Sequence, residues 1–233
     1  MSLIYFFRHG QAGIRTNYDT LSETGRRQSR LLGEHLVREG IRFTAAYCGE
    51  LRRQRETAAE VLAAGVDLPG FTVHAGWNEF DLDDVFRFHA AKIAAIDPQF
   101  RAEYEILRAA ARDPENEVQR QWSRCDMAVV RAWVEGRFDY PGESWQGFQD
   151  RVASCAGLLD GHGPDESVAI FTSATPISIW VKLALGAGAR KILPLAGAQF
   201  NTGITTLRRR GEEYDLFYFN AAPHLEPALR THR

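Results

Sequence analysis

Two patterns alternate along this chain: short, mostly apolar runs, and longer stretches in which apolar residues recur every three or four positions. Short apolar runs bounded by Gly, Pro, Asn, Asp or Ser are typical of buried β-strands. They predict strands at Leu3–Arg8, Phe43–Cys48, Phe71–His74, Ser167–Thr172, Thr202–Arg208 and Tyr214–Asn220. The last two strands surround Gly211, a residue type suited to a turn between them.

The longer stretches predict helices between these strands. One helix begins after Ser22, a residue type that commonly caps helix N-termini, and ends at Gly40; a second runs from about Leu51 to Ala64. Two more are predicted from Ser144 to Leu159 and from Pro176 to Leu185. Because strands alternate with helices, we expect a three-layer α/β/α fold in which helices cover both faces of a mainly parallel sheet.

One segment interrupts this alternation. From Asp83 to about Arg137 the pattern is helical, with breaks at Asp97-Pro98 and Asp113-Pro114. We therefore expect one domain over residues 1–233, with a helical lid inserted at about 83–140 and lying over the functional site. Its aromatic residues occur at helical spacing and are expected to form the lid's own core: Phe86, Phe88, Phe100, Tyr104, Trp122 and Trp133.

Composition argues against several classes of function. With 28 basic and 30 acidic residues the formal charge is −2, so nucleic acid is not expected as the main partner. The apolar start ends at Arg8, too early for a membrane span or a secretory signal, so no membrane partner is expected. A reducing cytoplasm is the expected location, because the cysteines form no disulfide framework or zinc pattern: Cys48, Cys125 and Cys155.

Candidate chemistry follows the first predicted strand, where Arg8, His9 and Gly10 stand at its carboxyl end. Ligand sites in open α/β sheets lie at this edge. Arg8 offers a permanently charged donor fork for an anion, His9 a nitrogen that is nucleophilic near neutral pH, and Gly10 room for close backbone approach. The same tripeptide also fits a strand that ends in polar residues as it leaves the core.

Ordered segments along the chain carry a resemblance to a known family. Phe7-Arg8-His9-Gly10-Gln11-Ala12 is followed by Leu21-Ser22-Glu23-Thr24-Gly25-Arg26-Arg27-Gln28 and by Leu51-Arg52-Arg53-Gln54-Arg55-Glu56-Thr57-Ala58. Further agreement lies at Asn78-Glu79-Phe80, Gly142-Glu143-Ser144-Trp145, Arg151-Val152, Asn220 and His224-Leu225. In this order the segments resemble the signature of the histidine phosphatase superfamily, the phosphoglycerate-mutase-like proteins, everywhere except in the insertion.

The resemblance implies a chemical role for each of four residues. His9 would attack the phosphorus of a phosphomonoester and form a phosphohistidine that water then hydrolyses. Arg8 and Arg53 would hold the nonbridging phosphate oxygens, and Glu79 would be the general acid that protonates the leaving group. Without the resemblance, Arg53 also fits a surface ion pair within its charged cluster, and Glu79 a solvated carboxylate.

One position departs from the family pattern. After the strand Ser167–Thr172 the family usually has a second histidine, which donates to the transferring phosphoryl group, whereas this chain has Ser173. A serine hydroxyl is shorter and always neutral, and loss of one preorganised donor typically lowers the rate by about 10² to 10³. An anion site is still expected, formed by Arg8, Arg53, the Ser173 hydroxyl and the backbone amides from Ala174 onward.

Two further residues are candidates for contacts with phosphate or substrate. His224 follows the last predicted strand, in a stretch that the family places near the pocket; it is the candidate to replace the missing histidine, and it also fits local packing. Asn17 lies in the loop after Gly10, where asparagine is also ordinary turn chemistry. The carboxylates near Glu79 lack the glycine and final glutamate of a calcium loop, so no metal or other cofactor is expected.

We therefore expect a phosphomonoester hydrolase that acts through phospho-His9, with activity reduced by the exchange at Ser173. Its partner is expected to be a small phosphorylated molecule or inorganic phosphate. Two alternatives stay open: a noncatalytic member of the fold that binds a phosphorylated ligand through the same arginines, and a phosphoglycerate-type mutase. Hydrolysis is favoured over the mutase because the segment Gln11–Asp19 lacks the tryptophan that glycolytic mutases show soon after the tripeptide.

Overall fold

The structure is a computed structural model that describes residues 2–116, 119 and 121–232. The chain forms two compact units. The first, called the sheet unit here, contains the chain up to Ala12, residues Asp19–Glu79 and the chain from Arg151 onward. The second, the helical unit, contains Gly13–Tyr18 and Phe80–Asp150. The helical unit is thus longer than the predicted insertion at 83–140, and it includes part of the loop that follows His9.

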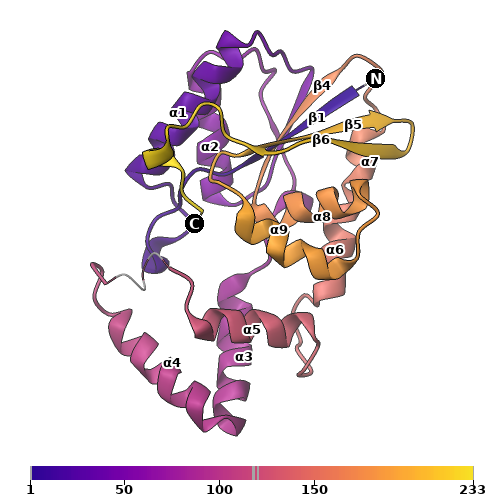
Figure 1. Ribbon diagram of the computed structural model, residues 1–233. Coiled ribbons are helices and arrows are strands. Elements are labelled where there is room, and N and C mark those ends of the chain that lie inside the picture. The colour runs from indigo at the N-terminus through magenta and orange to yellow at the C-terminus, as the bar shows by residue number, and fades with distance from the viewer. Residues whose placement is uncertain (1, 117–118, 120, 233) are drawn as a thin grey trace. The chain divides into compact units, whose positions relative to one another are not determined.

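The described part of the sheet unit is built on a six-stranded sheet (Figure 1). The strands, in the order in which they pair, are β3 (Thr72–Val73), β2 (Ala45–Cys48), β4 (Ser167–Thr172), β1 (Ser2–Arg8), β5 (Ile204–Arg210) and β6 (Glu213–Ala221). The first four are mutually parallel, whereas β5 and β6 pair antiparallel and turn at Gly211, whose φ is +62°. The predicted α/β class with a mainly parallel sheet is confirmed.

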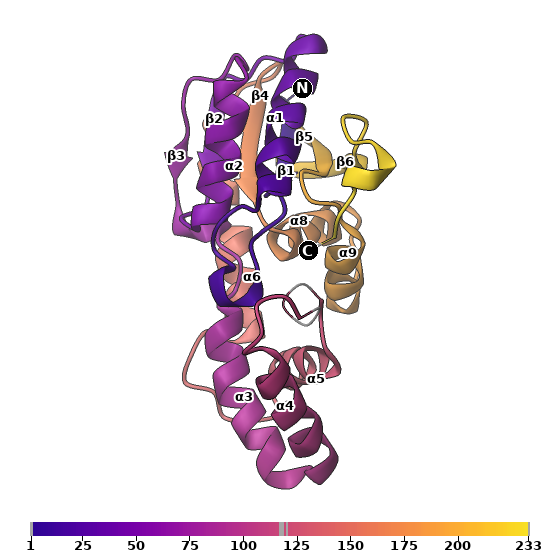
Figure 2. The same ribbon diagram turned by 90° about the vertical axis from the view of Figure 1, so that its left-hand side faces the viewer.

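Helices cover both faces of this sheet, because successive side chains of a strand point to opposite sides. Phe7 of β1 joins a buried cluster with side chains of α1 and α2, two helices that lie side by side (Figures 1 and 2). Phe6, on the opposite face, packs against Trp180 of α8 with ring centroids 5.6 Å apart. The helices of the sheet unit are α1 (Glu23–Arg38), α2 (Arg52–Ala63), α7 (Ala156–Leu159), α8 (Ala174–Ala184) and α9 (Ile192–Ala198).

The carboxyl ends of β1 and β4 bring candidate residues to one edge of the sheet. Arg8 of β1 pairs in register with Thr172 of β4, so His9 and Ser173 follow on neighbouring strands. The backbone N–H of His9 donates to the carbonyl of Thr172 over 2.9 Å. Because β2 runs parallel to β4 and ends at the same edge, the first turn of α2 with Arg53 also begins there.

Several elements differ from the prediction. The helix predicted from Ser144 to Leu159 is interrupted at Cys155, which separates α6 (Trp145–Ser154) from α7. The strand predicted at Phe71–His74 has only two paired residues, both exposed, since an edge position buries little. Helix α8 begins two residues before Pro176, because proline in the first turn loses no helical hydrogen bond. Helix α9 was not predicted, since its seven residues include a proline and a glycine.

The helical unit contains α3, α4 and α5, and α6 begins within it: α3 is Leu82–Ile96, α4 is Pro98–Ala110 and α5 is Arg124–Val134. Each of the three begins after a side chain that accepts a backbone N–H from the first turn. These caps are Asp81, Asp97 and Ser123. The predicted break at Asp97-Pro98 is therefore a true helix boundary.

Aromatic side chains form much of the core of the helical unit. Trp133 is buried and packs against Phe80, with ring centroids 4.7 Å apart, and against Trp145 at 5.3 Å. Trp122 is 46% exposed, so the prediction that it belongs to this core is wrong. It precedes α5, where no helical spacing applies.

An ion pair between half-buried Arg15 and buried Asp126 connects the loop Gly13–Tyr18 to α5 within the helical unit. The guanidinium of Arg15 donates to both carboxylate oxygens of Asp126 in α5, over 2.9 and 2.8 Å. Two parallel hydrogen bonds to one carboxylate define the orientation of both groups. The Asp126 side chain also completes the N-terminal cap of α5 with Ser123.

Candidate active site

His9 is buried at the end of β1, and its ring is oriented by two hydrogen bonds. Nδ1 lies 2.7 Å from the carbonyl oxygen of Gly10, and that oxygen only accepts, so Nδ1 carries the proton and donates it. Nε2 therefore holds the lone pair and accepts a hydrogen bond from Nε of Arg53 over 3.3 Å. This tautomer leaves Nε2 as the nucleophilic nitrogen.

The surroundings of His9 keep the imidazole neutral. Burial lowers its pKa well below 6.5, and the positive charges of Arg53 and Arg8 lower it further. The hydrogen bond to the Gly10 carbonyl raises the pKa and is the smallest of these effects. At neutral pH the ring is thus in the form that can attack phosphorus.

Close backbone packing holds the loop after His9 against α1. A Cβ atom at Gly10 would lie 2.5 Å from the carbonyl oxygen of Gly25, and one at Gly25 would lie 2.1 Å from that of Gln11. No side chain fits at either position. The N–H of Gly10 also donates to the hydroxyl of Thr57 in α2 over 2.9 Å, so both helices fasten this loop.

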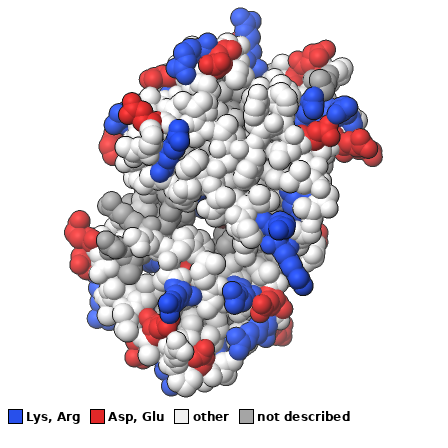
Figure 3. All heavy atoms as spheres, viewed as in Figure 1, with Lys and Arg blue, Asp and Glu red and all other residues white. Residues whose placement is uncertain are grey.

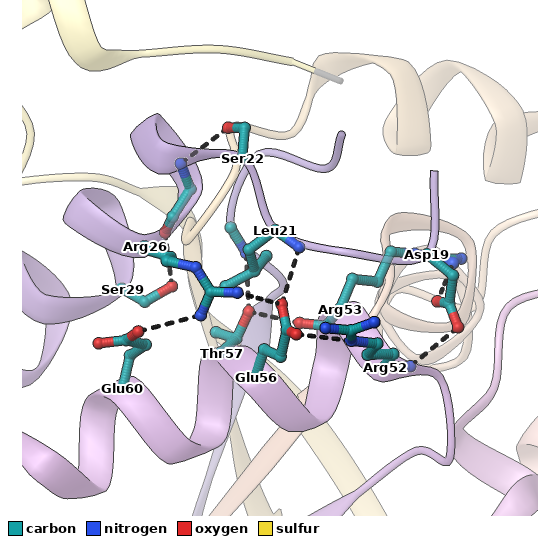
Figure 4. A network of polar contacts seen from close by, with 12 residues as sticks. Asp19, Leu21, Ser22, Arg26, Ser29, Arg52, Arg53, Glu56, Thr57 and Glu60 are labelled. Carbon is teal, nitrogen blue, oxygen red and sulfur yellow. Dashed lines mark hydrogen bonds and ion pairs between the residues drawn. The ribbon is translucent and has the colours of Figure 1, made fainter. Parts of the chain in front are cut away.

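Arg53 is held on its other side by a carboxylate. Its Nη1 donates to Asp19 over 2.8 Å, and the second oxygen of Asp19 accepts the backbone N–H of Arg52 over 3.1 Å (Figure 4). Arg53 is 6% exposed, so Asp19 and His9 fix its guanidinium in one orientation. The surface ion pair expected of this cluster belongs to Arg52, which contacts Glu56 over 2.7 Å.

Arg8 is buried and fastens the end of β1 to later parts of the chain. Its guanidinium donates to the backbone carbonyls of Gln199 and His232, the latter over 2.7 Å. The side-chain amide of Asn201 donates to the carbonyl of His9 over 3.1 Å. The segment before β5 therefore supports the strand end that carries His9. The role of Arg8 as a phosphate ligand stays a prediction.

Glu79 is placed by a core residue two positions earlier. Trp77 ends the 3-10 turn η2 (Ala75–Trp77), is fully buried and packs against Trp180 with ring centroids 5.8 Å apart. Glu79 itself is half-buried. Its Oε2 accepts the backbone N–H of Thr175, in the first turn of α8, over 3.1 Å. The carboxylate predicted as general acid thus lies where β4 leads into α8.

Ser173 precedes α8 and is buried, but it does not cap that helix. The N–H of Thr175 is directed to Glu79, and the third helical residue is Pro176, which has no N–H. The Ser173 hydroxyl oxygen instead accepts a hydrogen bond from the side-chain amide of Gln54 over 2.8 Å. A residue type that normally caps helices is used here for another contact.

The sequence pattern of the histidine phosphatase superfamily (branch 1) matches this chain over residues 4–135 and 113–222. The chain belongs to this superfamily. The matched ranges contain His9, Arg53 and Glu79, the residues whose surroundings are described above.

Relatives of this histidine phosphatase superfamily member include curated proteins and solved structures. It is 26% identical over 157 residues to the mitochondrial serine/threonine-protein phosphatase Pgam5 of Caenorhabditis briggsae, a match that covers 61% of the chain and 52% of the relative. The chain therefore spans about half the length of that relative.

Solved structures of other proteins share its fold, and two examples are phosphatases by description. One, from Escherichia coli K-12 and described as an alpha-ribazole-5′-P phosphatase, has a TM-score of 0.65 and 19% identity, with 95% of this chain and 98% of the other covered. The other is a phosphoserine phosphatase mutant from Entamoeba histolytica in complex with phosphoserine. Its TM-score is 0.62 at 16% identity, with 97% of this chain and 100% of the other covered.

The remaining predicted residues lie in different surroundings. Ala174 is the first residue of α8, so its N–H is one of the amides that begin that helix. His224 stacks on His35 and bonds through Nε2 to the hydroxyl of Thr202 over 2.9 Å. These contacts fit local packing, and the role of His224 in binding phosphate stays a prediction. Asn17 lies in the helical unit, and its role stays a prediction.

Sequence reasoning assigned no role to Gln54, although its position held a signal. Gln54 lies four and seven residues before Ala58 and Val61, all on the buried face of α2. A polar residue on an otherwise apolar helical stripe is expected to meet a polar partner. That partner is Ser173, which lies 119 positions further along the chain.

Arg151 is a second residue whose contacts the sequence did not indicate. Its Nη1 donates to the backbone carbonyls of Ala75, Gly76 and Asn78 over 2.9, 3.3 and 3.2 Å. The guanidinium therefore fastens the segment that leads into Glu79. No side-chain pattern could reveal this contact, because its partners are backbone carbonyls.

Surface charge is mixed on the face shown in Figure 3, where basic and acidic side chains are interspersed. In the part of the chain that the structure describes, no helix is long and apolar enough to cross a membrane. The described residues also contain no group of three or more His, Cys, Asp or Glu side chains placed to hold a metal ion.

Proposed function

We propose that this protein hydrolyses phosphomonoesters through a phosphohistidine on Nε2 of His9. The observation that carries the proposal is the state of the His9 ring. Nδ1 donates its proton to the Gly10 carbonyl, the lone pair of Nε2 lies beside Nε of Arg53, and the lowered pKa keeps the ring neutral. The phosphatases among its relatives support the reaction class.

In the first step Nε2 attacks phosphorus, forming the N–P bond as the P–O bond to the leaving group breaks. Glu79 gives a proton to the departing alkoxide, so that it leaves as an alcohol. Arg53 lies beside Nε2 and stabilises charge on the nonbridging oxygens of the transferring group. Asp19 accepts a hydrogen bond from Nη1 of Arg53 and so helps to hold the guanidinium in this orientation.

In the second step water attacks the same phosphorus, and the N–P bond breaks. Glu79, now a carboxylate, takes the proton from water; inorganic phosphate and neutral His9 are released. Ser173 stands where the family resemblance implies a second histidine, and in this proposal its hydroxyl is the neutral donor to the phosphoryl group. Turnover is slower than with a charged donor, by about 10² to 10³ if one donor's contribution is lost.

The expected substrates are small phosphorylated molecules. The Entamoeba histolytica relative was solved with phosphoserine, an example of this class. Hydrolysis, rather than transfer back to the product, is proposed because the segment Gln11–Asp19 has no tryptophan.

Turnover on a panel of phosphate esters tests this proposal. We expect phosphate release by the wild type, loss of at least about 10³ in kcat for His9→Ala, and no change for His162→Gln, whose ring pairs with Glu166 outside the site. If the wild type binds phosphate but releases no product from any ester, the protein is a noncatalytic binder of phosphorylated ligands. If His9→Ala turns over as fast as the wild type, hydrolysis does not proceed through His9.

A further inference from the structure

Gln54 is completely buried directly after Arg53 in α2. Its Nε2 donates to the hydroxyl oxygen of Ser173 over 2.8 Å and to the carbonyl oxygen of Trp77 over 3.2 Å. Two consecutive residues of one helix therefore meet both strand ends, because Arg53 contacts His9 and Gln54 contacts Ser173.

The partners of Gln54 settle which way its amide points. A backbone carbonyl only accepts, so the group near Trp77 is the NH₂, and the Ser173 oxygen must accept from the same NH₂. The amide oxygen lies on the other side, against the backbone of Gly49, where a Cβ atom would approach to 1.9 Å. Glycine at position 49 thus makes room for this orientation of the amide.

Because the Ser173 hydroxyl oxygen accepts a hydrogen bond from Gln54, the hydroxyl proton can be donated to another group. A hydroxyl has one O–H to donate, and a hydroxyl oxygen engaged by an N–H orients that proton away from the donor. Among the described residues the Ser173 hydroxyl makes no contact in which it donates. Its proton is therefore available to an acceptor that enters the site beside His9.

The same geometry limits the length of the side chain that fits at position 173. The amide nitrogen of Gln54 lies at hydrogen-bond distance from the last atom of the serine, and both side chains are buried. A longer side chain extended in the same direction from position 173 would overlap the Gln54 amide. Close-packed interiors do not absorb such an overlap without displacement.

We propose that Gln54 is a positioning residue for Ser173: it orients the serine hydroxyl so that its proton points at a phosphoryl oxygen, and it occupies the space that a larger donor would need. Gln54 and Ser173 then form one functional pair. This inference rests on the proposed hydrolysis through His9.

A double-mutant cycle in kcat tests the pair. Gln54→Leu keeps the volume of the side chain and removes the amide donor. We expect it to lower kcat about tenfold with a KM change below about threefold, and to have no effect when Ser173 is already alanine. Equal effects of Gln54→Leu in both backgrounds would overturn the proposal, because a merely structural role does not depend on the serine hydroxyl. Thermal melting of each variant shows that loss of fold is not the cause.

A second comparison tests the spatial part of the proposal. Ser173→His is expected to stay at or below wild-type kcat, whereas Ser173→His with Gln54→Ala, which frees the space, is expected to exceed Ser173→His by at least about tenfold. If Ser173→His alone performs as well as the double variant, Gln54 does not limit position 173. Gln149→Ala in place of Gln54→Ala is the control for removal of a different buried amide, because the Gln149 amide donates to the carbonyl of Trp145 in its own helix; no gain is expected from it.

The two proposals fail in different ways. If wild-type turnover is absent or does not depend on His9, the proposed function is wrong. If turnover depends on His9 but the effects of Gln54→Leu and Ser173→Ala on kcat are additive, the proposed hydrolysis is supported and the proposed pairing of Gln54 with Ser173 is wrong.

Discussion

At His9, three neighbours decide the chemistry that is available. The Gly10 carbonyl selects the tautomer, burial and two arginines keep the ring neutral, and Arg53 lies beside the free nitrogen. Gly10 and Arg8 adjoin His9 in the tripeptide, whereas Arg53 lies 44 positions away in the sequence. The nucleophile is thus prepared by the fold and not by its sequence neighbours alone.

Arg53→Gln is expected to raise the pKa of His9, because it removes a positive charge that opposes protonation. The value should stay below 6.5, since burial is the larger cause of the shift. NMR titration of the His9 ring measures this pKa, with Arg210→Gln, an exposed arginine paired with Asp215, as the control. A His9 pKa that does not change in Arg53→Gln would contradict this account of the site's electrostatics.

At the scale of elements, helix α1 and the loop after His9 depend on each other for position. Gly25→Ala places a Cβ atom 2.1 Å from the carbonyl oxygen of Gln11, a backbone atom that moves only with the loop. We expect a loss of about 1–3 kcal/mol in the free energy of unfolding, measured in urea, and lower kcat. Gly157→Ala is the matched control, because a Cβ there meets nothing within 4 Å; it should raise stability by about 0.5–1 kcal/mol. Equal stability of the two variants would show that the loop adjusts freely.

The segment that carries Glu79 is a second element with an identifiable support. Arg151→Met removes three hydrogen bonds to backbone carbonyls and keeps most of the side chain's apolar length. We expect kcat to fall about tenfold on substrates with poor leaving groups and much less on aryl phosphates, whose leaving groups need little protonation. The same loss of kcat on both substrate classes would show that Arg151 does not act through the general acid Glu79.

Much of the element order could be predicted from local patterns, and the exceptions have physical causes. Strands β1 and β4 and helices α1 and α2 are continuous in apolar spacing, so their predicted limits differ from the observed ones by at most two residues, and those of β4 agree. Trp122 was misplaced because burial of a single aromatic outside a helix depends on tertiary contacts. The Gln54 contact with Ser173 joins residues that only the sheet register brings together.

For the whole molecule, three histidines with a lowered pKa make stability depend on pH: His9, His35 and His224. The pKa of His9 is well below 6.5, and that of His224 is lowered to about 3, mainly by burial and further by positive charge nearby. Below 6.5 the unfolded chain binds protons that the native state excludes, so the free energy of unfolding falls as the pH falls. The slope is at most about 1.4 kcal/mol per pH unit for each histidine.

Urea unfolding at pH 7.0 and 5.5 measures this dependence. We expect a lower midpoint at pH 5.5, and a smaller difference between the two pH values for His224→Gln than for the wild type. An unchanged difference in His224→Gln would mean that its ring is protonated in the native state.

The most direct measurement of the central claim is the location of the phosphoryl group during turnover. Rapid quenching at alkaline pH, followed by mass spectrometry and ³¹P NMR, is predicted to find one phosphoryl group on Nε2 of His9, since Nδ1 is engaged by the Gly10 carbonyl. Turnover with no phosphorylated histidine, or with the phosphoryl group on any other residue, would contradict it.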